Sequence, residues 1–285
     1  MSRRWPVLAL VILTLVATSG CRNRAEGASS GGESIPRPAG KLPTSIAALG
    51  DSLSTGYGSC LVPVSCERNS WSTGTSAQVD SHYRRLLAVG ADIRDQTYNF
   101  AQPRARAADL AGQAARAVDA EPQYITLQIG ANDACRASVA DMTPVATFRA
   151  QVDDALRTIK RELPRTRVLV VSIPDVYRVW QLGHGRELVT EVWAGRVCPV
   201  LLADPTSMTK AAKDRRAAFR ARVNAYNKEL VAACKAYGKH CRSDGGAVHR
   251  VRFSLDMLTA FDFFHPNAEG LNAMAKATWP KSFTW

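Results

Sequence analysis

Three short apolar runs, each ended by glycine or proline and separated by helical patterns, constrain the fold of this chain most strongly. The runs cover residues 46–49, 123–130 and 167–174 (IAAL, QYITLQIG and RVLVVSIP). β-branched residues are common in the last two, as expected for buried strands. Strands of this kind that alternate with helices are typical of a mostly parallel sheet with helices on both faces.

The segments between these runs supply the helices. Helical patterns are predicted over residues 77–90, 105–120, 143–163, 209–237 and 267–277, and a further strand over 98–101. We therefore predict an α/β fold, a three-layer α/β/α sandwich with a mostly parallel central sheet. Residues 175–208 and 239–260 are expected to be irregular insertions around the open end of the sheet, where ligands bind in such folds.

The first 21 residues have the pattern of a secretory signal. Arg3 and Arg4 precede an apolar run over 5–17 that is too short to span a bilayer comfortably, and small residues follow. The segment ends in Thr-Ser-Gly-Cys, which resembles a bacterial lipobox with Cys21 as the lipidated residue. Thr18 stands where leucine is usual, so ordinary cleavage and full secretion are the alternative. We favour a lipoprotein held at the outer face of the cell membrane.

Residues 22–41 are rich in glycine, serine and proline, so they are expected to form a flexible tether before a single folded domain over 42–285. The net charge of +12 would suit nucleic acid, anionic lipid or an anionic cell wall. Lysine and arginine are scattered, however, and no dense basic tract with aromatic residues is present. We therefore expect no nucleic-acid partner, and we expect a monomer.

Six cysteines remain after Cys21, and an even number in an exported chain suggests disulfides. Six cysteines allow fifteen connectivities, so their spacing is only a guide. Two pairs are close enough to close local loops, Cys60 with Cys66 and Cys234 with Cys241. Cys135 and Cys198 would then remain, closing a long loop.

Three motifs, each placed after a predicted strand or before the last helix, carry the chemistry. Ser52 lies in GDSLS after the first strand, Asn132 lies in GAND after the strand 123–130, and Asp262 precedes His265 by three positions. A serine hydroxyl needs a base to become a nucleophile, and the base is most often a histidine oriented by a carboxylate. The amide of Asn132 and the backbone N–H of Ser52 are suitable donors to an oxyanion.

Two other site types are disfavoured. The chain lacks G-x-S-x-G, the nucleophile elbow of α/β-hydrolases. No further ligands lie near the Asp-x-x-His pair in sequence, so we expect no metal and no cofactor.

In this order, GDSLS, GAND and Asp-x-x-His resemble the GDSL/SGNH hydrolase family, and the six cysteines resemble its secreted actinomycete lipases and esterases. The resemblance implies that Ser52 is the nucleophile, His265 the base and Asp262 the residue that orients it. It also implies an oxyanion hole made of Ser52, Asn132 and a third backbone N–H. Arg104 stands where that family has glycine, so its N–H could serve only if its backbone suits a residue with a Cβ.

The same resemblance implies three sequential disulfides, Cys60–Cys66, Cys135–Cys198 and Cys234–Cys241. We predict an exported serine ester hydrolase of the lipase or carboxylesterase type, which acts on small-molecule or lipid esters through an acyl-enzyme. Two alternatives remain open. One is a polysaccharide O-acetylesterase acting on acetylated glycans, and the other is a non-catalytic surface binding lipoprotein on the same scaffold.

Overall fold

The computed structural model describes residues 35–195 and 197–285. The predicted signal segment, Cys21 and most of the predicted tether lie outside the described residues. The folded unit spans Ile35–Trp285 and therefore begins seven residues before the predicted domain boundary. Ala39 forms a parallel bridge with Ser282, and its backbone is hydrogen-bonded to Lys281 and Phe283. These bonds hold residues 35–41 against the C-terminal segment.

A five-stranded parallel sheet forms the centre of the described unit, with strand order β2-β1-β3-β4-β5. The strands are β1 Ile46–Gly50, β2 Thr97–Asn99, β3 Tyr124–Gln128, β4 Arg167–Val171 and β5 Cys241–Ser243. The three central strands, β1, β3 and β4, are almost entirely buried, which explains why their sequences are mostly apolar. The predicted α/β fold with a parallel sheet is confirmed.

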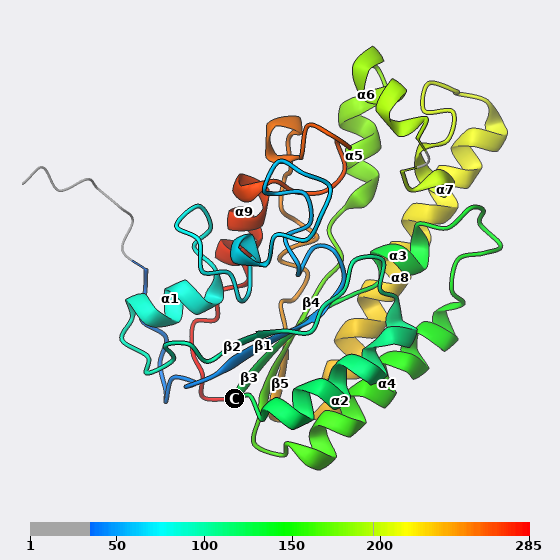
Figure 1. Cartoon of the computed structure of the whole chain (residues 1–285). Helices are drawn as coiled ribbons and strands as arrows, with labels where there is room; N and C mark the ends of the chain where they lie inside the picture. Colours follow the sequence, from blue (N-terminus) through cyan, green and yellow to red (C-terminus); the bar gives the residue numbers. More distant parts are fainter. Residues whose placement is uncertain (1–34, 196) are drawn as a thin grey trace, which may run out of the picture. The chain divides into compact units, whose positions relative to one another are not determined.

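Helices pack around this sheet in the described unit. They are α1 His82–Ala88, α2 Leu110–Ala120, α3 Ala131–Ala134, α4 Val145–Glu162, α5 Val176–Gly183, α6 Glu187–Trp193, α7 Pro199–Leu202, α8 Lys210–Tyr237 and α9 Ala268–Thr278, with 3-10 turns η1 Glu67–Asn69, η2 Ala107–Asp109 and η3 Leu255–Met257. Figure 1 shows α2, α4 and α8 side by side on one face and α1 and α9 on the other. The unit is therefore the predicted three-layer sandwich.

Side-chain caps set the starts of several helices. The side chain of Ser81 accepts a hydrogen bond at the start of α1, and Thr209 does the same for α8. Asn267 caps α9 by accepting from two backbone N–H groups. Gly238 ends α8 with φ +103°, which favours glycine at that position.

The two segments predicted to be irregular contain regular structure, so that prediction is wrong in part. Residues 175–208 form the short helices α5, α6 and α7, and residues 239–260 contain β5 and η3. The strand β5 has the sequence Cys-Arg-Ser, which is polar and only three residues long. It is fixed by pairing with β4 at the sheet edge rather than by an apolar pattern of its own.

Three disulfides are present, and they are the sequential pairs that the resemblance implied. They join Cys60 to Cys66, Cys135 to Cys198, and Cys234 to Cys241. The second one ties the residue after α3 to the residue before α7, so it joins two segments that border the open end of the sheet. Among the described helices, none is long and apolar enough to cross a membrane.

Candidate active site

Ser52 lies two residues after β1, in the turn that leaves the carboxyl end of the sheet. A Cβ at Gly50 would lie 2.1 Å from the carbonyl oxygen of Gln128, and its φ is +149°, so the strand can end this way only with glycine. The side chain of Gln113 accepts from the N–H of Gly50 at 2.7 Å and donates to its carbonyl at 2.9 Å. These contacts fix the backbone from which Ser52 projects.

Asp262 and His265 lie in the loop between η3 and α9. Asp262 Oδ1 accepts hydrogen bonds from the N–H of Phe264 at 2.9 Å and of His265 at 3.0 Å. It also accepts from the hydroxyl of Thr259 at 2.6 Å, and Trp193 Nε1 donates to the carbonyl oxygen of Asp262 at 3.2 Å. The carboxylate is therefore held by three donors before any contact with the imidazole ring.

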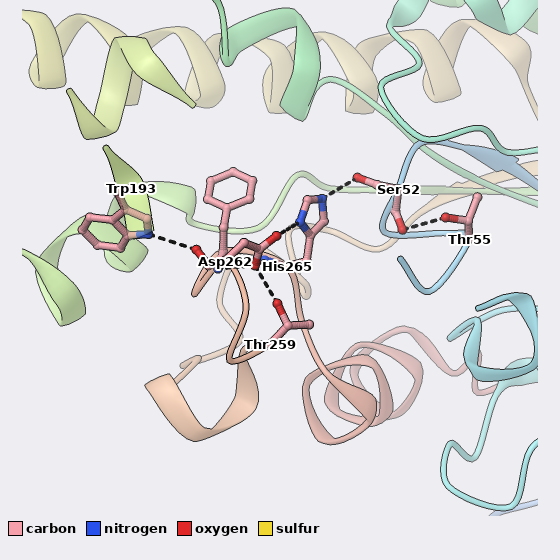
Figure 2. Close-up of polar contacts among 7 residues, drawn as sticks. Ser52, Thr55, Trp193, Thr259, Asp262 and His265 are labelled. Carbon is pink, nitrogen blue, oxygen red and sulfur yellow. Dashed lines mark hydrogen bonds and ion pairs between the residues drawn. The ribbon is translucent and has the colours of Figure 1, made fainter. Parts of the chain in front are cut away.

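The three side chains that the motifs singled out form one hydrogen-bonded chain, as Figure 2 shows. Nδ1 of His265 lies 2.5 Å from Asp262 Oδ2, and Nε2 of His265 lies 2.9 Å from Ser52 Oγ. An ionised carboxylate only accepts, so Nδ1 carries the ring proton and Nε2 is left to accept the proton of Ser52. This is the geometry that activates a serine for attack on a carbonyl carbon.

The electrostatics of Asp262 support an ionised carboxylate. Burial alone would raise its pKa, but the hydrogen bonds from His265 and Thr259 and the charge of His265 outweigh it and lower the pKa below its ordinary value. Asp262 is only 7% exposed, so water competes little for these bonds. A carboxylate in this state can stabilise the imidazolium that forms when His265 takes a proton.

The residues predicted for the oxyanion hole line one cavity together with Ser52. Asn132, in α3, donates one amide hydrogen to the carbonyl of Ala105 at 3.0 Å, which fixes the amide and leaves its second hydrogen available. Arg104 has φ +66°, the left-handed conformation that glycine adopts most easily. The backbone at this position thus has the shape that the expected glycine would take, although the residue has a Cβ.

Behind the site lie two buried carboxyl groups, Asp51 and Asp133. Asp51 is fully buried, and burial raises its pKa to about 7, with a smaller increase from the charge of Asp133. Burial likewise raises the pKa of Asp133, whose Oδ2 accepts from the N–H of Ala107. Neither residue lines the two cavities described next. Asp51 Oδ1 accepts from the N–H of Leu53 in the turn that carries Ser52, and Asp133 connects α3 to the first residue of η2.

Two cavities meet at Ser52, Asn132 and His265. The narrow cavity has a volume of about 40 Å³ and is lined mainly by apolar side chains, namely Leu53, Val176, Val179, Phe253, Leu258 and Phe264. The wide cavity has a volume of about 460 Å³, and its lining includes all five predicted site residues together with Tyr57 and Arg136. Motifs from distant parts of the chain therefore converge on one place.

Four contributors to the site lie outside the set of residues predicted from the motifs. Thr259 and Trp193 hold Asp262, Tyr57 packs on the ring of His265 with a centroid distance of 4.8 Å, and Arg136 lines the wide cavity. Thr259 had a usable signal, since it lies three residues before Asp262, the spacing at which a hydroxyl reaches a carboxylate in a tight turn. Among the described residues, no group of three or more metal-binding side chains is present.

Comparisons with solved structures agree with this architecture. An α/β hydrolase enzyme from the metagenome of Lake Arreo, Spain, shares 17% identity with a TM-score of 0.51, over 85% of this chain and 94% of the other. A protein named as a GDSL-like lipase, from Parabacteroides merdae ATCC 43184, shares 15% identity with a TM-score of 0.53, over 85% and 97%. An extracellular lipase from Streptomyces rimosus shares 20% identity over 82% and 99%, with a TM-score of 0.48.

At these identities, the first two structures show the fold. No curated protein matches the chain. The family model described as GDSL-like Lipase/Acylhydrolase matches residues 46–278, which is most of the chain and includes every motif of the site. The chain therefore belongs to the GDSL-like lipase/acylhydrolase family.

Proposed function

We propose that this protein is a carboxylic ester hydrolase that works through an acyl-enzyme on Ser52. The observation that carries the proposal is the chain of hydrogen bonds from Asp262 through His265 to Ser52, at 2.5 and 2.9 Å, at the junction of two cavities. Ester hydrolysis needs a nucleophile, a base and room for both arms of the ester, and this place offers all three.

In the first half of the reaction, Ser52 Oγ attacks the ester carbonyl carbon while His265 Nε2 takes the hydroxyl proton. The carbonyl oxygen becomes an oxyanion, stabilised by the N–H of Ser52, the amide of Asn132 and, as the third donor, the N–H of Arg104. The bond to the alcohol oxygen then breaks, and His265 gives its proton to the leaving alcohol. Asp262 stabilises the imidazolium between these two transfers.

In the second half, a water molecule gives a proton to His265 Nε2 and attacks the acyl carbon. The new oxyanion collapses, the bond to Ser52 Oγ breaks, and the serine recovers its proton from His265. The products are one acid and one alcohol, and the enzyme returns to its starting state.

The narrow cavity sets the size of the acyl group. A volume of about 40 Å³ corresponds to roughly three water molecules, since each needs about 10–15 Å³ measured in this way. It therefore favours acetyl to butyryl groups over long fatty acyl chains. This supports a carboxylesterase rather than a long-chain lipase, and it also accommodates the acetyl group of an O-acetylated glycan.

The proposal is tested by fluorophosphonate labelling and by hydrolysis of p-nitrophenyl esters from C2 to C16. The wild type should be labelled and should prefer the short esters. Ser52→Ala should lose labelling and at least about a thousandfold in kcat. Equal labelling or equal turnover by the two proteins would reject the nucleophile. A folded, inactive wild type that still binds ester or glycan would support the non-catalytic alternative.

We also propose that the protein is exported and anchored through a lipid on Cys21. Support comes from the three disulfides, which persist in oxidising compartments. Membrane retention of the wild type and release of Cys21→Ser on cell fractionation are expected. Equal fractionation of both proteins would argue against the anchor.

A further inference from the structure

Two arginines line the wide cavity without a counter-ion. Arg104 and Arg136 both border it, and neither guanidinium has an ion pair or hydrogen bond to any residue in the described part of the chain. Nε of Arg136 is in addition buried and unpartnered. Arg149, in contrast, pairs with Asp153 and Glu229. A buried donor that lacks an acceptor costs free energy, so Nε of Arg136 favours a ligand with acceptor oxygens. Arg104 is exposed, and its contribution is a positive charge on the same cavity wall.

The charge of the cavity wall points the same way. Asp262 is the one carboxylate among the described lining residues, and both its oxygens already accept from His265 and Thr259. The wall therefore presents two uncompensated positive charges. The narrow cavity differs, because Asp175 borders it and its other lining residues include no basic side chain except the imidazole of His265. An anionic group would be repelled from the narrow cavity and attracted into the wide one.

We propose that the wide cavity binds an anionic group, with phosphate as its best fit, on the alcohol part of the ester. Arg104 and Arg136 are its ligands. This inference rests on the proposed hydrolysis at Ser52 and names its substrate class, an ester with a short acyl group and a phosphate-bearing alcohol. The planar guanidinium fork matches phosphate oxygens, and two such groups can hold one phosphate from two sides.

Arg104 has two proposed roles, because its side chain binds the anionic group and its backbone N–H binds the oxyanion. The same residue supplies the proposed third oxyanion N–H, so binding of the leaving group and of the oxyanion would depend on one backbone position. The glycine expected there carries no charge. The exchange of glycine for arginine thus adds a positive charge beside the reacting centre while the left-handed backbone is kept.

The test compares two matched substrates, 1-butyrylglycerol 3-phosphate and 1-butyrylglycerol, by kcat/KM. The wild type should prefer the phosphate ester by about tenfold or more, as expected for one or two charge-assisted hydrogen bonds. Arg136→Gln should lower that preference several-fold, mainly by raising KM for the phosphate ester, whereas Arg104 retains part of it. Arg94→Gln removes the same charge from an exposed arginine outside both cavities and is the matched control.

A second measurement separates this inference from the proposed function. Calorimetry measures the binding of glycerol 3-phosphate and of glycerol to Ser52→Ala. It reports on the anion site without any ester hydrolysis. Selective binding of the phosphate, weakened in Arg136→Gln, supports the site even if no ester is hydrolysed. Turnover of both esters at equal rates, together with no selective binding, overturns it and leaves ester hydrolysis intact.

A comparison of activity on lipid vesicles and on the soluble ester distinguishes the two sources of the phosphate, a lipid headgroup and a small phosphorylated alcohol. Higher activity on short-chain phosphatidylglycerol vesicles than on the soluble ester would identify a lipid headgroup. Activity confined to the soluble ester would identify a small phosphorylated alcohol. Either result supports the anion site, and a preference that is unchanged between low and high salt would count against it, because a charged contact at an open cavity is screened.

Discussion

The fully buried Asp51 makes the stability of this protein depend on pH in an unusual direction. Its pKa is raised to about 7 in the folded protein, chiefly by burial, from an ordinary value of 3.8. Between these two pH values the folded chain holds a proton that the unfolded chain has released. Ionisation at this site therefore destabilises the fold as pH rises from about 4 to 7.

The size of the effect follows from the difference between the two pKa values. Each pKa unit corresponds to about 1.4 kcal/mol, so the cost approaches about 4 kcal/mol above pH 7. Between pH 5 and pH 8 the expected loss is about 3 kcal/mol, because part of the change has already occurred at pH 5. Asp51→Asn replaces the carboxyl with a neutral group of the same shape and should remove this loss.

The measurement is the free energy of unfolding in urea for both proteins at pH 5 and pH 8. Asp51→Asn should gain about 3 kcal/mol relative to the wild type between the two pH values. Asp92→Asn, which changes an exposed carboxylate, should follow the wild type and is the control. Parallel profiles for the wild type and Asp51→Asn would refute the reasoning, since they would mean that Asp51 is ionised in the folded protein.

Three further predictions concern stability and rate. Burial lowers the pKa of His82 to about 3, so protonation of this residue in the unfolded chain should contribute a loss of about 3 kcal/mol in stability from pH 7 to pH 4, opposite in sign to the contribution of Asp51. His82→Gln should lack this loss relative to the wild type when both are unfolded in urea at the two pH values. Thr259→Val removes a hydrogen bond to Asp262 and should lower kcat on p-nitrophenyl butyrate by about tenfold, with little change in KM. A kcat equal to that of the wild type would show that the bond is dispensable. Arg104→Gly should have a free energy of unfolding about 1 kcal/mol higher than that of Arg104→Ala, because of these two residues only alanine is strained at φ +66°. Equal melting temperatures for the two variants would contradict this.

The strands that could be predicted from the sequence are those that are buried along almost their whole length. Strands β1, β3 and β4 are almost entirely buried, so each one is mostly apolar, and a glycine or proline stands at its end or within three residues after it. The helices α5 and α6 were not found, because they are short and bury only one side of a few turns. The edge strand β5 has no apolar pattern at all, since pairing with β4 defines it.

The site shows the same division. Ser52, Asn132, Asp262 and His265 lie in motifs whose order along the chain is informative, and the structure brings their side chains to one place. The contact of Trp193 with Asp262 depends on how the segment after β4 folds back, and no local pattern encodes that path. The volumes of the two cavities likewise depend on packing between distant segments, so the proposed size limit on the acyl group had no signal in the sequence.

The bridge between Ala39 and Ser282 has a mechanical consequence. Tension that enters the folded unit through Ile35 meets the hydrogen bonds of Ala39 to Lys281 and Phe283 before it reaches β1. Those bonds lie near the amino end of β3, where Phe283 packs on Tyr124, whereas Ser52 follows the carboxyl end of β1. A pull on the N-terminal side would therefore act first on the hydrogen bonds of Ala39, at one end of the sheet. Ser52, at the other end, would experience little of that force.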